Sequence, residues 1–317
     1  MDAAPGGFEL LSPGASLRWG RCRFELNPPP GGRADFAVAL YNARPFDAFA
    51  CAPENTLFIA GEPRGKKLYP QGFYRQFGHV VDSHPDSRHP NLHVSALGLN
   101  WHVGLAHGQY RIGYDHLATL PRPQKENRIA VVCSNAAKTP GQRARLVLLD
   151  ALKSRLGDRL VHFGRGFTPI ADKFDAILPY RFQLVLENGI QENYWTEKLI
   201  DAYLGWAYPV YWGCPNLADY LPADAFVSIT GLAPDDAARR IAALLDAPLS
   251  PAQEAALSEA RRRVLEVYSP FAWMAHWVET LYRPGLPERR VVFRSHKAYR
   301  RFLRGAWFRL RHARDTA

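Results

Sequence analysis

Residues 182–213, which read FQLVLENGIQENYWTEKLIDAYLGWAYPVYWG, decide the fold class. An apolar run at 182–186 precedes a polar loop, apolar residues at helical spacing follow at 199–207, and a second apolar run occupies 208–212. Short continuous apolar runs are typical of strands that are covered on both faces. A strand, a helix and a strand joined by short loops predict a right-handed crossover between parallel strands.

The same alternation is found on the amino-terminal side of this stretch. The runs RIAVVCSN (128–135) and RLVHFG (159–164) have the pattern of strands, and QRARLVLLDALKSRLG (142–157) between them has the pattern of a helix that ends at a glycine. A later helix is expected to begin at Ser250, its N-cap, with Pro251 in the first turn. The sequence therefore predicts an α/β protein with a doubly wound parallel sheet.

The length and composition allow a second domain. With 317 residues, 47% of them hydrophobic and 22% charged, the chain is long enough for two globular domains. Its amino-terminal part predicts strands separated by irregular connections, and the polar segment 116–128 contains two prolines and no periodicity. We therefore expect a linker there, with domains at 1–118 and 119–285 and a tail at 286–317.

The net charge of +10 is concentrated in the tail. Between residues 288 and 315 the chain has ten lysines or arginines and two acids, which together contribute +8. Tyr299, Leu303, Trp307 and Leu310 form an apolar stripe among these arginines, a pattern that suits a helix on an anionic membrane surface. The alternative is a closing helix that packs on the body. Nucleic-acid binding is not favoured, because no groove-reading or base-stacking motif accompanies the charge.

Other features bear on the location of the protein. No apolar window approaches the roughly 20 residues of a membrane span, and the start MDAAPGGFELLSPG lacks the basic and apolar regions of a secretory signal. The four cysteines are far apart and form no metal-type pair, so reduced, buried thiols are expected. These features predict a cytoplasmic protein, or one that is peripheral on the cytoplasmic face of a membrane.

Polar residues gather where the strand at 182–186 ends. Asn188 lies just past the carboxyl end of that strand, and Glu197 and Lys198 open the following helix. In open parallel sheets ligands bind in this crevice, and the amides of a helix N-terminus favour phosphates. The sequence therefore predicts a site for a phosphorylated ligand.

Residues 180–222, YRFQLVLENGIQENYWTEKLIDAYLGWAYPVYWGCPNLADYLP, resemble the signature of the α-1,3/4-fucosyltransferases, glycosyltransferase family 10, of the bacterial type. That signature runs aromatic-Lys/Arg-Phe, Phe-Glu-Asn, Tyr-Val/Ile-Thr-Glu-Lys, an apolar helix, and Pro-Val-Tyr/Val-Trp/Leu-Gly. Leu186 replaces its usual phenylalanine. A weaker resemblance covers residues 131–152, VVCSNAAKTPGQRARLVLLDAL, and selects Arg145.

The resemblance implies a GT-B-like fold with two facing Rossmann-like domains. The domain at 1–118 would bind the acceptor and the domain at 119–285 would bind GDP-fucose. The implied reaction is an inverting transfer of L-fucose to a hydroxyl of a glycan, such as a lipopolysaccharide precursor. Two alternatives stay open: the same scaffold with another nucleotide sugar, and a non-catalytic carbohydrate- or membrane-binding protein.

The resemblance also assigns roles within the donor pocket. It implies no cofactor and no obligatory metal, and the chain contains no Asp-x-Asp motif. Fixed cations must then stabilise the departing diphosphate, with Arg145 and Lys198 as the charges and Asn188 as a further donor. Tyr194 would lie beside the nucleotide, and Glu197 would contact sugar hydroxyls near the developing oxocarbenium ion. The structural alternatives are a packing tyrosine, an exposed helix arginine and a first-turn acid that stabilises its own helix.

An inverting transfer also needs a base for the acceptor hydroxyl. The resemblance points to a glutamate at the end of an amino-terminal strand, and FIAGEP (58–63) offers Glu62, whose alternative is a turn carboxylate. The histidines of SHPDSRHPNLH, His84, His89 and His93, lack the closer spacing of zinc ligands, so a loop is favoured over a metal site.

Overall fold

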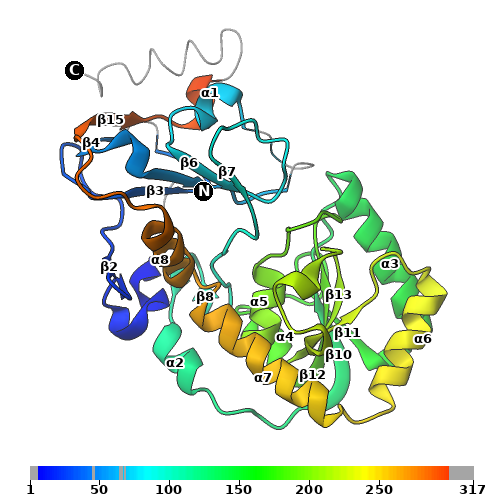
Figure 1. Cartoon of the computed structure of the whole chain (residues 1–317). Coiled ribbons are helices and arrows are strands. Elements are labelled where there is room, and N and C mark those ends of the chain that lie inside the picture. Colours follow the sequence, from blue (N-terminus) through cyan, green and yellow to red (C-terminus); the bar gives the residue numbers. More distant parts are fainter. Residues whose placement is uncertain (1–5, 45–46, 64–66, 68, 300–317) are drawn as a thin grey trace. The chain divides into compact units, whose positions relative to one another are not determined.

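A computed structural model describes residues 6–44, 47–63, 67 and 69–299 (Figure 1). The chain forms two compact units that are interleaved along the sequence. Unit 1 contains residues 20–97 and those from 274 on, and unit 2 contains 98–273 and the segment that ends at residue 19. This division places 98–118 with unit 2 and 274–285 with unit 1, whereas the predicted domains were contiguous.

Unit 2 is built on a five-stranded sheet in which every neighbouring pair of strands is parallel. Its strand order is β11-β10-β12-β13-β14. The strands are β10 Glu126–Val132, β11 Leu160–Phe163, β12 Tyr180–Leu186, β13 Tyr208–Trp212 and β14 Val227–Ser228. The chain leaves β10 on one side to form β11 and crosses to the other side to form β12. The gap between the carboxyl ends of β10 and β12 is therefore the switch point at which such sheets bind ligands.

Helices cover both faces of this sheet (Figure 1). One face carries α3 Pro140–Leu156 and α6 Pro234–Leu245, and the other carries α4 Phe174–Ile177, α5 Glu197–Leu204 and α7 Pro251–Glu266. Because both faces are covered, the residues from Phe182 to Leu186 in β12 are all buried, as their apolar run predicted.

The helix boundaries follow from local chemistry. Thr139 caps α3 in a reciprocal capping box with Gln142, and the helix ends at Gly157, whose φ of 55° favours glycine. Ser250 caps α7 with Pro251 in the first turn, as predicted.

Unit 1 contains a smaller parallel sheet in the order β3-β5-β6-β7. Its strands are β3 Ala37–Leu40, β5 Thr56–Ile59, β6 His79–Asp82 and β7 Leu92–Val94, with α1 at Gln71–Tyr74. The fully buried ring of Phe58 packs against those of Tyr69 and Phe73, each at a centroid distance of 4.9 Å. Beside this core, β4 Asp47–Cys51 pairs antiparallel with β15 Arg289–Phe293. The predicted α/β class, with a parallel sheet in each of two units, is confirmed.

The remaining described elements are short, apart from one helix. They are β1 Arg18–Trp19, β2 Cys22–Arg23, β8 Leu105–Ala106, β9 Gln109–Tyr110, α2 Tyr114–Thr119, α8 Pro270–Leu281, and the 3-10 turns Phe8–Leu11, Pro13–Ala15, Pro53–Asn55, Gly157–Arg159, Leu217–Asp219, Ala223–Ala225 and His296–Tyr299. The segment interpreted as a linker, 116–128, overlaps α2 and β10, and its Leu117 is fully buried. An inward-facing leucine therefore makes the first part of this segment a packed helix.

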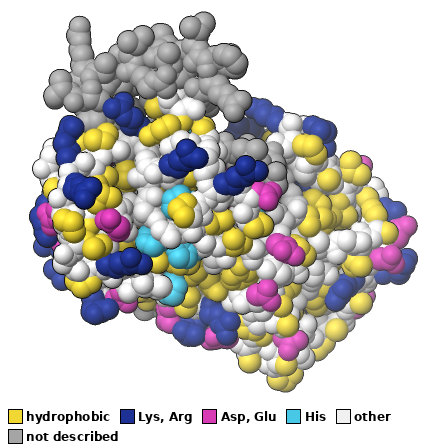
Figure 2. Space-filling view, turned by 45° about the horizontal axis from the view of Figure 1, so that its top comes forward, with side chains coloured by type: hydrophobic (Ala, Val, Ile, Leu, Met, Phe, Trp, Pro, Cys, Tyr) yellow, Lys and Arg dark blue, Asp and Glu magenta, His cyan; other side chains and the backbone are white. Residues whose placement is uncertain are grey.

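The predicted tail helix lies mostly outside the described residues, the last of which is Tyr299. Within the described ranges, every helix is too short or too polar to cross a bilayer. On the face shown in Figure 2, basic and acidic side chains are interspersed and several histidines lie close together.

Candidate functional site

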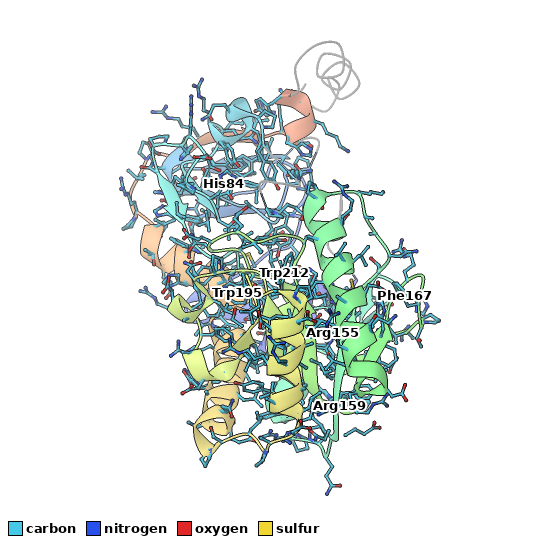
Figure 3. The ribbon with its side chains drawn as sticks, turned by 90° about the vertical axis from the view of Figure 1, so that its right-hand side faces the viewer. His84, Arg155, Arg159, Phe167, Trp195 and Trp212 are labelled. Atoms are coloured by element: carbon cyan, nitrogen blue, oxygen red, sulfur yellow. The ribbon has the colours of Figure 1, made fainter. Side chains whose placement is uncertain are left out.

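The candidate site lies at the carboxyl edge of the unit 2 sheet. Figure 3 shows Trp212, the last residue of β13, and Trp195, just before α5, toward the same end of this sheet, with Arg159 at the opposite end. A Cβ atom on Gly141, in the first turn of α3, would lie only 2.0 Å from the carbonyl oxygen of Asn188. The absence of a side chain thus lets the start of α3 contact the loop after β12. This contact joins the two halves of the predicted site, α3 with Arg145 and the segment after β12 with Asn188 and Lys198.

Arg145 joins the two halves through its side chain. It is only 5% exposed, and its Nη1 donates a hydrogen bond to Oδ1 of Asn188 at 2.9 Å. Its Nε is buried and has no hydrogen-bond partner among the described residues, none of which forms an ion pair with it. A buried guanidinium with so few partners is costly unless an acceptor completes it. Arg145 is therefore prepared to bind an anion.

Lys198 lies at the start of α5 between two carboxylates. Its Nζ is 3.0 Å from Oε1 of Glu197 and 3.4 Å from Oε2 of Glu187, and it donates to Oγ1 of Thr196 at 3.0 Å. Glu187 is fully buried and accepts hydrogen bonds from the amide of Thr196 at 2.8 Å and from its hydroxyl. A Cβ on Gly213 would lie 2.6 Å from Cγ of Glu187. Through these contacts the Glu187 carboxylate fixes the first residues of α5 and the position of the Lys198 side chain.

The charges of Glu197 and Lys198 stabilise each other. Burial raises the pKa of Glu197, but Lys198, His102 and Lys173 outweigh it and hold that pKa well below its usual range. Burial lowers the pKa of Lys198, but Glu197 and Glu187 outweigh it and hold that pKa above its usual range. For Glu187, burial dominates and raises the pKa despite the attraction of Lys198. Near neutral pH the site therefore contains a carboxylate at Glu197 and an ammonium at Lys198.

Arg145 and Lys198 both influence a residue at the carboxyl end of β10. Cys133 directly follows β10, and burial raises the pKa of its thiol, while Arg145 and Lys198 both oppose that rise electrostatically. Arg145 comes from α3 after β10, and Lys198 comes from α5 after β12. Both positive charges thus come from the segments that follow the two adjacent strands at the switch point, although they lie 53 positions apart in the sequence, at 145 and 198.

Tyr194 occupies a different environment from the other predicted donor residues. It is only 1% exposed and lies near Tyr211 and Cys214 in the interior. The preceding Asn193 adopts a positive φ of 59°, and its amide donates to Oδ1 of Asn216 at 2.9 Å. The loop that bears Tyr194 is therefore fixed, and contact of its ring with a nucleotide stays a prediction. Its neighbour Trp195 is also buried.

Glu62 belongs to unit 1, where it follows β5 at the carboxyl edge of the parallel sheet. On the adjacent β6, Asp82 accepts hydrogen bonds from the hydroxyls of Tyr74 at 2.8 Å and Ser87 at 2.7 Å. Burial raises the pKa of Tyr69 well above its usual value, and Tyr74, Asp82 and Glu62 add to this. Two carboxylates therefore lie close to one tyrosine at this edge.

Sequence reasoning missed or left undecided several residues of these two clusters. The sequence leaves Glu187 open between a strand-end acid and a site residue, and it assigns no role to Thr196 or Asp201. An acid in the otherwise apolar helix LIDAYL was the available signal for Asp201, which is 1% exposed. Of the three histidines in the segment 83–93, His93 contacts a further histidine on β6: its Nε2 is 3.2 Å from Nδ1 of His79. Across the described residues, no group of three or more His, Cys, Asp or Glu is placed to hold a metal ion.

Comparison with known proteins identifies the part of the chain that contains this site. Residues 122–247 match the family model described as glycosyltransferase family 10 (fucosyltransferase), C-terminal. We call this matched segment the family 10 domain. The family 10 domain contains Arg145, Asn188, Tyr194, Glu197 and Lys198, whereas Glu62 lies outside it. The resemblance drawn from the sequence is confirmed.

Two curated relatives are similar to this domain. The chain is 31% identical over 107 residues to the α-(1,3)-fucosyltransferase FucT of Helicobacter pylori, an alignment that covers 34% of this chain and 22% of the relative. It is also 31% identical over 112 residues to 4-galactosyl-N-acetylglucosaminide 3-α-L-fucosyltransferase 9 of Bos taurus, which covers 34% of this chain and 30% of the relative. The chain thus spans less than a third of the length of either relative.

A solved α1,3-fucosyltransferase with GDP-fucose is similar over 89% of this chain and 96% of its own, at 16% identity and a TM-score of 0.49.

Proposed function

We propose that the protein is an inverting glycosyltransferase that transfers L-fucose from GDP-fucose to a hydroxyl of a glycan acceptor. The observation that carries this proposal is the pair of cations, Arg145 and Lys198, at the switch point of a family 10 domain. The relatives named as fucosyltransferases support fucose as the sugar. An acceptor such as a lipopolysaccharide precursor is part of the same proposal.

The two cations would bind the diphosphate of the donor. The unsatisfied Nε of Arg145 and the ammonium of Lys198 supply charge where negative charge develops as GDP departs. Asn188 orients the guanidinium through its side-chain oxygen. Tyr194 would line the nucleotide side of this pocket. The groups that stabilise the leaving GDP would then be built into the protein, and neither a cofactor nor an obligatory metal is proposed.

The reaction would be a single displacement at the anomeric carbon. The acceptor oxygen forms a bond to that carbon, the bond from the carbon to the phosphate oxygen breaks, and GDP leaves with the electron pair. Glu62 takes the proton of the acceptor hydroxyl as general base. The carboxylate of Glu197, kept ionised by Lys198, stabilises the positive charge that develops on the sugar ring.

Ligand binding by the purified chain tests the donor assignment. Thermal shift and titration calorimetry would be run with GDP, UDP, CMP, GDP-fucose and GDP-mannose, with and without a chelator, because a ligand that binds only the folded state raises Tm. We expect GDP and GDP-fucose to bind and the chelator to have little effect. Binding of UDP in preference to GDP would contradict the donor assignment.

A pair of arginine variants on one helix tests the site itself. Arg145→Ala removes the buried guanidinium, whereas Arg143→Ala removes an exposed one two residues away. We expect GDP affinity to fall by about 10- to 100-fold for Arg145→Ala, in keeping with the loss of charge-assisted hydrogen bonds, and to stay unchanged for Arg143→Ala. Equal affinities in the two variants would remove Arg145 from the site.

Membrane contact through residues 286–317 and a cytoplasmic location complete the proposal. The concentration of basic residues in this segment supports the first of these. Co-sedimentation with phosphatidylserine vesicles should be lost at high salt, and neutral vesicles serve as the control.

A further inference from the structure

A short segment before the family 10 domain is fixed within unit 2 by three successive amides. The amides of His102 and Val103 donate to Oδ1 of Asp201 at 2.6 and 3.1 Å, and the amide of Gly104 donates to Oδ1 of Asp172 at 3.0 Å. All of these residues belong to unit 2. Two carboxylates thus fix the path of the backbone through residues 102–104.

Asp201 ties this segment to the helix that bears the candidate site. It lies four residues after Glu197 in α5, so the two side chains project from the same face of the helix. Asp201 also forms an ion pair with Lys173, whose Nζ is 2.5 Å from Oδ2. The loop of His102 is therefore bound one helical turn from the carboxylate that would meet the donor sugar.

The side chain of His102 is held in place but has unused hydrogen-bonding groups. Its neighbours Trp101 and Val103 are fully buried, and the hydroxyl of Tyr110 donates to the carbonyl of Trp101 at 2.6 Å. His102 is partly exposed, and its ring nitrogens form no hydrogen bond with any described residue. A ring fixed by its backbone, with open nitrogens, can bind a ligand without reordering.

The charge around His102 determines what kind of group it can bind. Burial, with the nearby charge of Lys173, lowers the pKa of His102, and Glu197 and Asp201 oppose this only in part. Near neutral pH the ring is therefore uncharged, with one N–H donor and one nitrogen acceptor. This combination matches a sugar hydroxyl, which both donates and accepts.

We infer that His102 is a specificity-determining residue of the donor site, where its ring exchanges a hydrogen bond with a hydroxyl of the sugar beside Glu197. The inference rests on the proposed function and extends it to a residue outside the matched segment 122–247. Because its contact is with the sugar, His102 contributes to the affinity for GDP-fucose but not to that for GDP.

The test compares the affinities of GDP and GDP-fucose by titration calorimetry for the full chain and three variants. The variants are His102→Ala, His102→Gln, which retains hydrogen-bonding groups, and the control His116→Ala on the exposed face of α2. For His102→Ala we expect GDP-fucose to bind about 5- to 15-fold more weakly, in keeping with the loss of one or two hydrogen bonds, and GDP to bind as before. His102→Gln should recover part of the loss, and His116→Ala should bind both ligands like the wild type.

The outcomes separate this inference from the function on which it rests. If the wild type binds GDP-fucose and His102→Ala binds it equally well, the inference is wrong and the proposed function stands. If His102→Ala or His102→Gln weakens GDP and GDP-fucose by the same factor, the residue has a structural role and the inference is also wrong. If the wild type binds neither ligand, both proposals fall together.

Discussion

The two parallel sheets of this protein end in polar clusters of different chemistry. At the carboxyl edge of unit 2, Lys198 lies between two carboxylates and Arg145 has an amide oxygen and an unsatisfied Nε. At the carboxyl edge of unit 1, Asp82 instead accepts hydrogen bonds from two hydroxyls, those of Tyr74 and Ser87. The same topology thus gives one edge suited to an anion and one suited to neutral polar groups, because the loop residues determine the chemistry.

The largest expected effect comes from the carboxylate at the unit 1 edge. Glu62→Gln keeps the shape and removes the base, so we expect kcat for transfer to fall by about 10²- to 10⁴-fold, with GDP affinity unchanged. GDP release in the presence of an acceptor glycan measures this. Glu54→Gln, an exposed change in the same unit, should leave kcat intact. If Glu62→Gln kept full activity, the assignment of the base to the unit 1 edge would be wrong.

The next effect concerns the cation at the unit 2 edge. Lys198→Ala leaves Glu187 and Glu197 without their shared partner, so the site becomes negative and repels a diphosphate. We expect GDP to bind at least about 10-fold more weakly, with a lower Tm, because a buried carboxylate loses its counter-charge. Calorimetry and thermal melts measure the two effects. The control is Arg159→Ala at the opposite end of the sheet (Figure 3), whose GDP affinity should match that of the wild type.

A smaller effect should be confined to unit 1. Ser87→Ala removes a buried hydroxyl that donates to Asp82 at 2.7 Å. We expect the free energy of unfolding to fall by about 1–3 kcal/mol, the cost of leaving a buried carboxylate oxygen with fewer donors, while GDP affinity stays the same. Urea titration checks the first effect against Ser258→Ala on the exposed side of α7. A large loss of GDP binding would show that the two edges are not chemically separate.

The smallest effect is a pH dependence at the amino edge of the unit 2 sheet. Lys125 precedes β10 and donates to the carbonyls of Ile177, Leu178 and Tyr180. Burial, helped by Arg122, lowers the pKa of Lys125 from 10.5 to about 7. Between these two values the unfolded chain holds more protons than the folded one, so stability from this group increases as pH rises.

Thermal melts of the wild type and Lys125→Met measure this dependence. We expect the difference in Tm, wild type minus variant, to grow as the pH is raised from 7 to 10. A difference that stays constant or shrinks over this range would show that the folded protein retains the proton on Lys125, and that the three carbonyls outweigh its burial.

The local parts of the fold were predictable because their causes are local. The apolar run of β12, the cap at Ser250 and the glycine that ends α3 each depend on neighbouring residues. The position of Asn188, Glu197 and Lys198 at a strand end followed from the strand–helix–strand pattern. The contact between Asn188 and Arg145 required in addition that β10 and β12 be adjacent, as they are.

The parts that sequence reasoning did not foresee depend on residues that are distant along the chain. The pairing of β4 with β15 joins segments near opposite ends of the chain, so no local pattern indicates it. The bond between Asp201 and the amide of His102 likewise depends on tertiary packing. The burial of Tyr194 follows from loop contacts to Asn216, which is itself part of a later segment. The identity of the site residues was therefore easier to predict than the tertiary contacts that hold them in place.

The pairing of β4 with β15 has a consequence for synthesis on the ribosome. All five strands of the unit 2 sheet have been translated once residue 228 is in place, whereas β4 still lacks its partner until residue 293. Domains generally fold as they are translated, but here unit 1, whose parallel sheet is translated before that of unit 2, is completed last. An unpaired edge strand is prone to aggregation, so the nascent chain must keep β4 apart from other chains while the family 10 domain is being made.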